Sequence, residues 1–351
     1  MLLTTDSAEM EEGMMENDII TMAHGGGGSK TDQLIKEVIH PRLRNPVLDQ
    51  MEDSACIDSP GDRLAVSTDS YVVDPVFFPG GNIGDLAVSG TVNDLAMQGA
   101  EPLYLTLGLI IEEGFPVRDL EMVLDSIRER LASNTALVIT GDTKVVESSG
   151  KSSIYINTAG IGVRRYPGDF SVRNACEGDA VIVTGSIGDH GLAVLSCREG
   201  LEFSSALESD SAPLWSMIEG ILKEHHPDIH SLRDPTRGGL ATLLSETAKE
   251  SGKGIKIKEH DIPVKKEVRG ACSMLGLDPL ESANEGKAVV ICNRESAGSI
   301  LKTLRTFPEG SDAAVIGEVV SEHRRRVVME TETGGLRRVE TPSGTNLPRI
   351  C

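Results

Sequence analysis

Aromatic residues are scarce in this chain of 351 residues: Phe, Trp and Tyr make up 3%, whereas hydrophobic residues as a whole make up 39%. The core must therefore consist mainly of Val, Ile, Leu and Ala, which is typical of α/β and α+β proteins with well-covered sheets. The length is sufficient for two domains of ordinary size. We therefore expect a two-domain α/β protein.

Basic residues are also few, with 34 Lys and Arg against 54 Asp and Glu, so the net charge is −20. This balance argues against general binding to nucleic acid or to an anionic membrane, because both need a basic surface. It does not argue against a nucleotide ligand, because Mg²⁺ can be bound by carboxylates and phosphates together.

Long apolar runs are missing as well, and none approaches the roughly 20 residues that a membrane helix needs. Residues 1–17 are acidic and lack the basic start and apolar stretch of a secretory signal. We predict a disordered acidic leader over residues 1–23 and a reduced, cytoplasmic protein. The cysteines show no metal-binding spacing, and four of them are predicted to be small core residues: Cys56, Cys197, Cys272 and Cys292.

Strands and helices are predicted to alternate in both halves of the chain. Turn residues at 164–178 mark a boundary between domains at 24–165 and 175–340. The tail, 341–351, contains two Pro and one Gly and is expected to be mobile. The first half is predicted to hold strands 64–73, 103–111, 135–140 and 153–163, with helices 31–39, 82–98 and 117–132. The second is predicted to hold strands 179–184, 255–258, 287–292, 313–320 and 326–331, with helices 186–198, 211–226, 238–251, 264–275 and 294–305.

A glycine run at residues 24–30, HGGGGSK, is similar to a Walker A phosphate loop but departs from it. Ser29 stands where that motif needs Gly before the Lys, and no strand is predicted before the run. The run is either a linker or a loop whose backbone N–H groups bind phosphates. On the second interpretation the binding residues are Gly26, Gly27 and Gly28.

Several aspartates occupy positions that do not suit them. Asp69 lies in a predicted strand and Asp94 in a mostly apolar helix, where Asp is disfavoured. A buried carboxylate is costly unless it is paired or binds a metal. Each Asp alone could be a cap or a turn residue. Taken with Asp53 and Asp142, they predict a Mg²⁺ site for a triphosphate.

Two motifs in the second half can also be read in two ways. Residues 234–239, DPTRGG, are either an ordinary helix start or an anion site at a helix N-terminus, with Asp234 binding a metal. Residues 284–287, NEGK, are either a polar turn or the place of a proton acceptor, Glu285. In the first half, Lys144 could stabilise phosphate or developing negative charge.

The chain ends in PRIC, with a cysteine as its last residue, Cys351. Chain termini are usually poorly ordered, so a structural role for this thiol is not evident. A thiol on a mobile end can instead be loaded at one site and unloaded at another. By itself, this feature also fits an accidental tail cysteine.

Together these segments resemble the HypE family of hydrogenase maturation proteins, carbamoyl dehydratases of the PurM-like ATP-binding superfamily. The resemblance covers about residues 22–351, and the terminal PRIC is its most specific element. The matching stretches are HGGGG at 24–28, residues 68–102, GDTKVV at 141–146, DPTRGG, NEGK and PRIC.

The resemblance implies two PurM-like α/β domains, the first with a mixed sheet, that pair through their sheets into a homodimer. Cys351 would accept a carbamoyl group from HypF and be dehydrated with ATP and Mg²⁺ to a thiocyanate. Its cyanide would pass to iron on the HypC–HypD complex, with Lys144 and Glu285 assisting the chemistry. The implied ATP-binding residues are Gly26, Gly27, Gly28, Asp69, Asn93, Asp94, Asp142, Thr143, Asp234, Arg237 and Gly238. The implied metal ligands are Asp53, Asp69, Asp94, Asp142 and Asp234.

Two other interpretations remain open. A related ATP enzyme acting on a diffusible substrate would not need Cys351. A non-catalytic scaffold for other maturation proteins would not turn over ATP.

Overall fold

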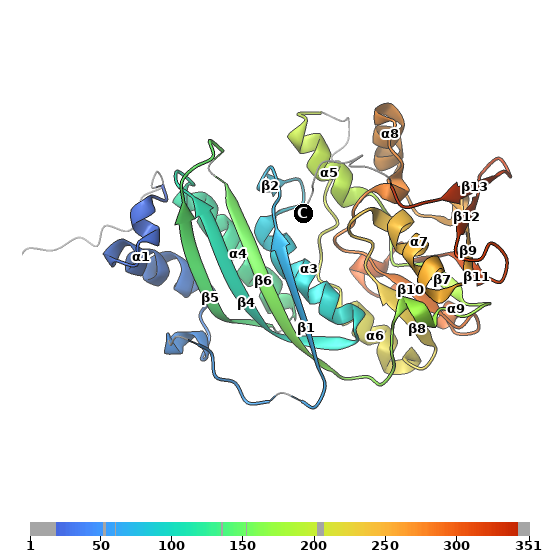
Figure 1. The fold of residues 1–351 in the computed structure, drawn as a ribbon, viewed down its shortest axis with the longest axis horizontal. Helices are drawn as coiled ribbons and strands as arrows, with labels where there is room; N and C mark the ends of the chain where they lie inside the picture. The colour runs from blue at the N-terminus through green and yellow to red at the C-terminus, as the bar shows by residue number, and fades with distance from the viewer. Residues whose placement is uncertain are drawn as a thin grey trace, which may run out of the picture.

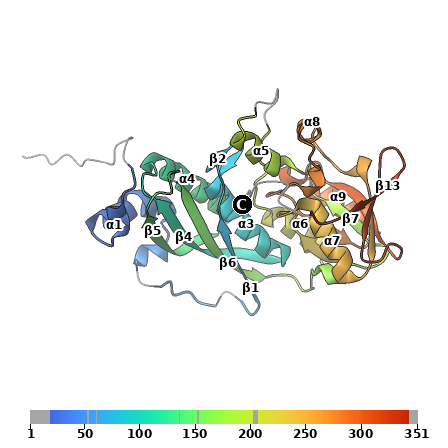
Figure 2. The same ribbon diagram turned by 45° about the horizontal axis from the view of Figure 1, so that its top comes forward.

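The computed structural model describes residues 19–51, 54–59, 61–134, 136–151, 153–201 and 207–342. Two lobes lie side by side, each built around one β-sheet, and helix α3 (Ile83–Met97) lies where they meet (Figures 1 and 2). This arrangement confirms the predicted two-domain α/β class.

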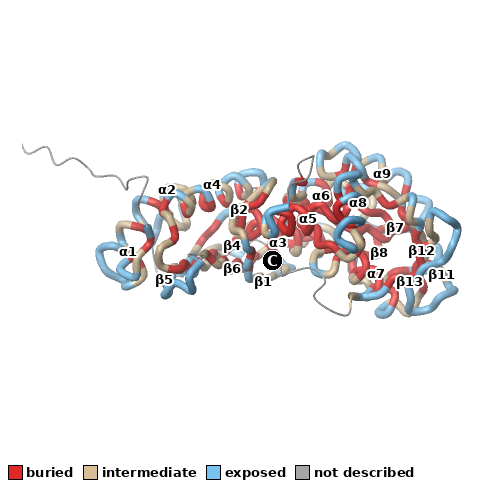
Figure 3. Tube along the Cα trace, turned by 90° about the horizontal axis from the view of Figure 1, so that it is seen from above, coloured by how far each residue is buried: buried red, intermediate tan, exposed pale blue. Residues whose placement is uncertain are grey.

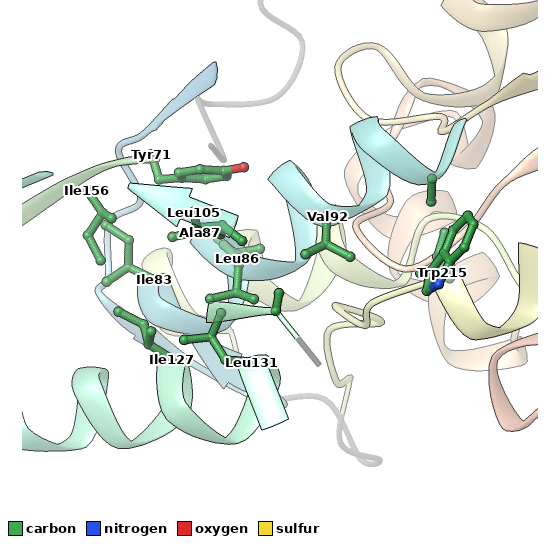
Figure 4. Packing of buried hydrophobic residues seen from close by; sticks show 14 of the residues in the cluster. Tyr71, Ile83, Leu86, Ala87, Val92, Leu105, Ile127, Leu131, Ile156 and Trp215 are labelled. Atoms are coloured by element: carbon green, nitrogen blue, oxygen red, sulfur yellow. The ribbon is translucent and has the colours of Figure 1, made fainter. Parts of the chain in front are cut away.

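The first lobe contains a mixed sheet with the strand order β1-β6-β4-β5. Strand β6 (Ile154–Arg164) pairs antiparallel with both β1 (Leu64–Tyr71) and β4 (Ala100–Glu112), and β4 pairs parallel with β5 (Leu137–Val146). Helices α3 and α4 (Val117–Asn134) pack on one face of this sheet. Figure 4 shows Leu86, Leu105, Ile127 and Ile156 in the core between them, while Val92 lies on the side of α3 towards Trp215 of the second lobe.

The second lobe contains a larger sheet with the order β13-β12-β9-β11-β7-β10-β8. Buried aliphatic residues fill the space between this sheet and its helices, and they form the red interior of this lobe in Figure 3. The strands are β7 (Ala180–Val183), β8 (Ile229–Arg233), β9 (Gly254–Lys258), β10 (Val289–Cys292), β11 (Ala314–Val320), β12 (Val327–Glu330) and β13 (Leu336–Val339). The helices are α5 (Asp189–Arg198), α6 (Trp215–His225), α7 (Gly239–Ser251), α8 (Lys266–Leu275) and α9 (Ala297–Leu304).

Several local predictions differ from the structure. Strands β8 and β13 and the small β2–β3 hairpin (Phe77–Phe78, Gly81–Asn82) were not predicted from the sequence. Strand β5 continues six residues beyond the predicted end at 140, because residues 141–146 pair with β4. The predicted helix 31–39 extends from α1 (Ser29–Gln33) through a π-helical turn (Leu34–Ile39) to α2 (His40–Leu43).

Two predictions about burial are wrong. Cys56 and Cys197 are exposed, whereas Cys272 and Cys292 are buried as predicted. Ile20, at the end of the predicted disordered leader, is fully buried, and its backbone N–H donates to the carbonyl of Phe115 at 2.7 Å. Among the helices of the described ranges, none is both long enough and apolar enough to cross a bilayer.

Candidate functional site

A cavity of about 300 Å³ lies between the two lobes. The first lobe contributes Asp69 from β1 and Asp94 from α3, and the second contributes Asp234, Arg237 and Glu285 from loops. Helix α3 faces the cavity at Gly90 and Asp94, and Asp94 is the one residue of this helix that is not buried. The structure therefore brings together five residues that are up to 216 positions apart in the sequence.

Carboxylates in this cavity disturb one another. Burial, and then the charge of Asp94, raises the pKa of Asp69, although Arg237 opposes the rise. The same two causes raise the pKa of Asp234 to about 7. Ser67 donates a hydrogen bond to Asp94 at 2.5 Å. Such a concentration of negative charge favours a bound cation, and oxygen ligands suit Mg²⁺.

The three carboxylates do not form a closed metal cage. Within the described residues, Asp69, Asp94 and Asp234 are not among the groups whose ligand atoms all lie within 4.8 Å of one another. Mg²⁺ is usually bound by one or two carboxylates together with phosphates and water. The arrangement therefore fits metal ions shared with a triphosphate.

The start of α7 forms part of the same cavity. Gly238 and Gly239 have φ values of 69° and 58°, and a Cβ on Gly239 would lie 2.4 Å from the carbonyl oxygen of Ser282. The DPTRGG turn can therefore enter the helix only with glycine at this close approach. A helix N-terminus beside Arg237 suits an anionic ligand.

Glu285 is held from both sides through its backbone. Its N–H donates to Asp210 Oδ1 at 3.1 Å, and its carbonyl accepts from Asn93 Nδ2 at 3.1 Å. Lys287 Nζ lies 3.4 Å from the other carboxylate oxygen of Asp210. The Glu285 residue is only 4% exposed, so it occupies a fixed position at the cavity wall.

Asn93, predicted to bind ATP, has another set of contacts in this structure. Its Nδ2 also donates to the carbonyl of Ala212 at 3.0 Å, and its Oδ1 accepts from the N–H of Leu214 at 2.8 Å. The side chain is 1% exposed and joins α3 to backbone of the second lobe. A contact with nucleotide would require it to leave these partners.

Four of the other predicted site residues lie at a second cavity, of about 370 Å³. Gly27, Asp142, Thr143 and Lys144 line it together with apolar side chains of the first lobe, and Gly26 and Gly28 flank Gly27 in the glycine run. Lys144 Nζ lies 3.2 Å from Asp142 Oδ1, and both side chains are mostly exposed. The sequence analysis expected Asp142 to lie with the other aspartates, but within one chain it lines this separate cavity. Asp53 and Cys351 lie outside the described residues.

Sequence reasoning missed Tyr71 as a site residue. This buried side chain lines the cavity between the lobes, with its hydroxyl 3.5 Å from Asp69 Oδ2 and 3.3 Å from Thr91 Oγ1. Burial, and then the charge of Asp69, raises the pKa of Tyr71 well above its usual value, so it stays protonated. The only signal in the sequence was its place two residues after Asp69, which is unremarkable for a strand tyrosine.

Comparisons with known proteins show which class of protein has this fold. Residues 51–164 match the N-terminal domain of AIR synthase related proteins, and residues 177–330 match the C-terminal domain. The chain is thus an AIR synthase related, PurM-like protein, which confirms the predicted fold.

Full-length relatives narrow this class to one family. Carbamoyl dehydratase HypE of Azotobacter vinelandii is 47% identical over 96% of this chain and 98% of its own length. The Escherichia coli protein of the same name is 43% identical over 95% and 99%. A crystal structure of hydrogenase maturation protein HypE in complex with ATP, 45% identical, superposes with a TM-score of 0.90 over 94% of this chain and 99% of that one. A HypE–HypF complex, 46% identical, gives a TM-score of 0.77 over 88% and 99%. The chain therefore belongs to the HypE family of hydrogenase maturation proteins.

Proposed function

We propose that this protein dehydrates a carbamoyl group carried on its own Cys351, using ATP, and so makes a thiocyanate for the maturation of a [NiFe]-hydrogenase. The observation that carries the proposal is the cavity between the lobes, where Asp69, Asp94 and Asp234 stand beside Arg237 and the buried Glu285. Two findings on relatives support it: curated relatives are named carbamoyl dehydratase, and one solved relative is bound to ATP.

The reaction converts Cys–S–C(O)NH₂ and ATP into Cys–S–C≡N, ADP, phosphate and a proton. The amide oxygen attacks the γ-phosphorus of ATP, and the C–O bond then breaks as the oxygen leaves with the phosphate. Both N–H protons are lost as the C≡N bond forms. A substrate attached to the chain makes these steps effectively intramolecular.

Different residues of the cavity would carry out different parts of this reaction. Asp69, Asp94 and Asp234 would hold Mg²⁺, which neutralises charge on the triphosphate during phosphoryl transfer. Arg237 and the glycine turn before α7 would bind phosphate oxygens. Glu285 would accept a proton from the amide nitrogen, because its backbone is fixed and its side chain is buried at the cavity wall. The pKa rise of Tyr71 keeps its hydroxyl available as a donor to Asp69.

A homodimer explains why the predicted ATP-binding residues occupy two separate cavities in one chain. The face of the first sheet opposite α3 and α4 exposes apolar residues, with Val66 at 70% exposure, Leu64 at 49% and Ile110 at 44%. Pairing two copies through this face covers it. It also allows Asp142, Thr143 and Lys144 of one copy to approach the aspartates of the other. Lys144 would then stabilise negative charge on the transferred phosphate or the amide.

Two kinds of partner follow from the chemistry. A carbamoyl donor must load Cys351, and HypF is the proposed donor because a solved relative forms a HypE–HypF complex. A cyanide acceptor must receive the product, and iron on a HypC–HypD complex is the proposed acceptor. These steps are proposed to take place in the cytoplasm.

Peptide mass spectrometry on Cys351 tests the proposal directly. The thiol is carbamoylated by HypF or by cyanate, and Mg-ATP is then added. We expect the Cys351 peptide to lose one water, only when ATP is present. Cys351→Ala should bind ATP but form no product, whereas Cys197→Ala, which changes an exposed cysteine of α5, should behave as wild type.

Other outcomes favour the other interpretations. A carboxamide that persists on a folded, ATP-binding protein would point to an enzyme with a diffusible substrate. A carboxamide that persists with no nucleotide bound would point to a scaffold. Normal cyanide delivery by Cys351→Ala would contradict the mechanism.

A further inference from the structure

Three metal-binding types of side chain meet in the second lobe, away from the cavity described above. Cys176 and Asp179 belong to the turn before β7, and His230 belongs to the start of β8. One potential ligand atom from each lies within 4.8 Å of the other two. The sequence gave no metal-like spacing for Cys176, because His230 joins the group only through the fold.

The turn that carries two of these residues is well defined. The N–H of Cys176 donates to Asp179 Oδ2 at 2.7 Å, and the N–H of Asp179 donates to the carbonyl of Cys176 at 3.1 Å. Gly178, between them, has a φ of 92°, which favours glycine. The Asp179 side chain is 5% exposed. The relative positions of Cys176 and Asp179 are therefore set before any ligand binds.

His230 is already hydrogen-bonded to this turn. Its Nδ1 lies 2.7 Å from Asp179 Oδ2, and its side chain is 28% exposed. Cys176 is exposed, and its thiol donates a hydrogen bond of 3.3 Å to the carbonyl of Asn174, which is weak because S–H is a weak donor. The thiol can therefore turn towards the imidazole and the carboxylate without breaking a strong hydrogen bond.

Ions can reach this group from solvent. Cys176 and His230 line a cavity of about 740 Å³, which Asp169 and His226 also line. None of the residues around this cavity lines the cavity between the lobes. His230 and Asp234 are four residues apart along β8 and its end, or about 13 Å at the rise of an extended strand.

We propose that Cys176, Asp179 and His230 bind one divalent transition-metal ion of the Zn²⁺ class. Thiolate, imidazole and carboxylate together suit such borderline ions, whereas Mg²⁺ prefers oxygen alone. The ion takes the place of the proton between His230 and Asp179, and the imidazole then carries its proton on Nε2. The Cys176 thiol releases its proton to solvent when the sulfur–metal bond forms. Three protein ligands leave a position for water or another ligand.

A Co²⁺ titration of the full-length protein, purified in the presence of a chelator that is then removed, tests this site. Thiolate bound to Co²⁺ gives a near-ultraviolet charge-transfer band that oxygen ligands do not give. We expect this band to saturate at one equivalent and to be displaced by Zn²⁺. Cys176→Ser should abolish the band, and His230→Gln should weaken Co²⁺ binding by more than about 10–100-fold, because it removes a ligand and the loss of an outer partner alone costs that much.

Three controls separate this site from others. Cys351→Ser should keep the band, since the tail thiol is not involved, and so should Cys197→Ser. Asp234→Asn should keep it as well, because its carboxylate belongs to the cavity between the lobes. Both Cys176 and His230 have exposed surface, so circular dichroism should show folded variants.

The proposal is overturned if wild-type protein gives no thiolate band with Co²⁺. It is also overturned if the band persists in Cys176→Ser or disappears in Cys351→Ser. In each of these cases the contact between His230 and Asp179 is only a structural hydrogen bond that holds the turn.

Discussion

At the scale of single residues, carboxylates in unfavourable places carry the functional signal. Asp94 is the one residue of α3 that is not buried, and Asp69 lies within strand β1. The charged form of Asp69 is destabilised when no cation is present, because burial and then the charge of Asp94 raise its pKa. Sites of this kind are often less stable than the rest of a fold because function requires them.

The pKa of Asp234 leads to a prediction about stability and pH. Its value of about 7 in the folded protein, against 3.8 ordinarily, means that the folded state binds more protons between these values. Stability of the metal-free protein should therefore fall as pH rises from about 4 to about 7. Asp234→Asn removes this charge, and at about pH 8 in a chelator it should raise the melting temperature by roughly 2–4 °C.

Thermal unfolding followed by circular dichroism measures the effect, with Asp142→Asn as the control. The Asp142 side chain is 70% exposed, so its replacement should change little. A shift for Asp234→Asn that is as large at about pH 5 as at about pH 8 would show that ionisation is not its cause.

Asn93 provides a second test at this scale. Asn93→Ala leaves the backbone groups of Ala212, Leu214 and Glu285 without these partners, which should lower the free energy of unfolding by about 1–3 kcal/mol. Urea unfolding measures the loss, and Asn293→Ala, at an exposed asparagine, should lose less. A loss of ATP affinity with unchanged stability would instead support the nucleotide contact expected from the sequence.

At the scale of elements, the glycine run is more closely packed at its start than a linker would be. Residues 22–25 form a short 3₁₀ helix, and a Cβ on Gly25 would lie 2.7 Å from Val145 Cβ of strand β5. Gly28 precedes α1, has a φ of −99°, and has open space where its Cβ would lie. The run therefore packs against the strand that carries Asp142 and Lys144.

This difference in packing predicts that the same substitution will change stability at Gly25 but not at Gly28. Gly25→Ala should destabilise the first lobe by about 1–3 kcal/mol, because the methyl group overpacks the contact with β5. Gly28→Ala should leave stability nearly unchanged. Urea unfolding of both variants measures this, and equal losses would contradict the packing described for Gly25.

At the scale of the whole molecule, the first sheet is covered by the described helices on one face only. Helices α3 and α4 cover one face of the first sheet (Figure 1). The other face carries exposed apolar residues. Apolar side chains exposed on one face of a sheet suit an interface with another protein surface. The proposed homodimer uses this face.

Val66→Asp should therefore weaken the homodimer, because it places a charge in the proposed interface. Size-exclusion chromatography with light scattering should show a shift from dimer to monomer, with a parallel loss of ATP turnover. Met274→Asp is the matched control, since Met274 is 79% exposed on α8 of the other lobe. Wild-type protein that is monomeric at all concentrations would contradict the homodimer.

Much of the fold could be predicted from the sequence because hydrophobic periodicity is local. Strand β4 lies close to its predicted bounds because apolar residues alternate along it, and helix α4 does so because its pattern is clearly amphipathic. Strands β8 and β13 were missed because short segments with charged residues acquire strand structure only from their neighbours in the sheet. Burial of Cys56 and Cys197 was predicted wrongly for a similar reason, since apolar neighbours in sequence do not ensure burial.

By itself, the sequence determined which chemical groups are present and which family the chain resembles: the aspartates, DPTRGG, NEGK and the terminal PRIC. Only the tertiary structure decided which of these groups meet. It placed Asp69, Asp94 and Asp234 in one cavity, Asp142 and Lys144 in another, and Cys176 beside His230. The physical reason is that motifs follow from residues adjacent in the chain, whereas these contacts depend on how two sheets, their helices and two lobes pack together.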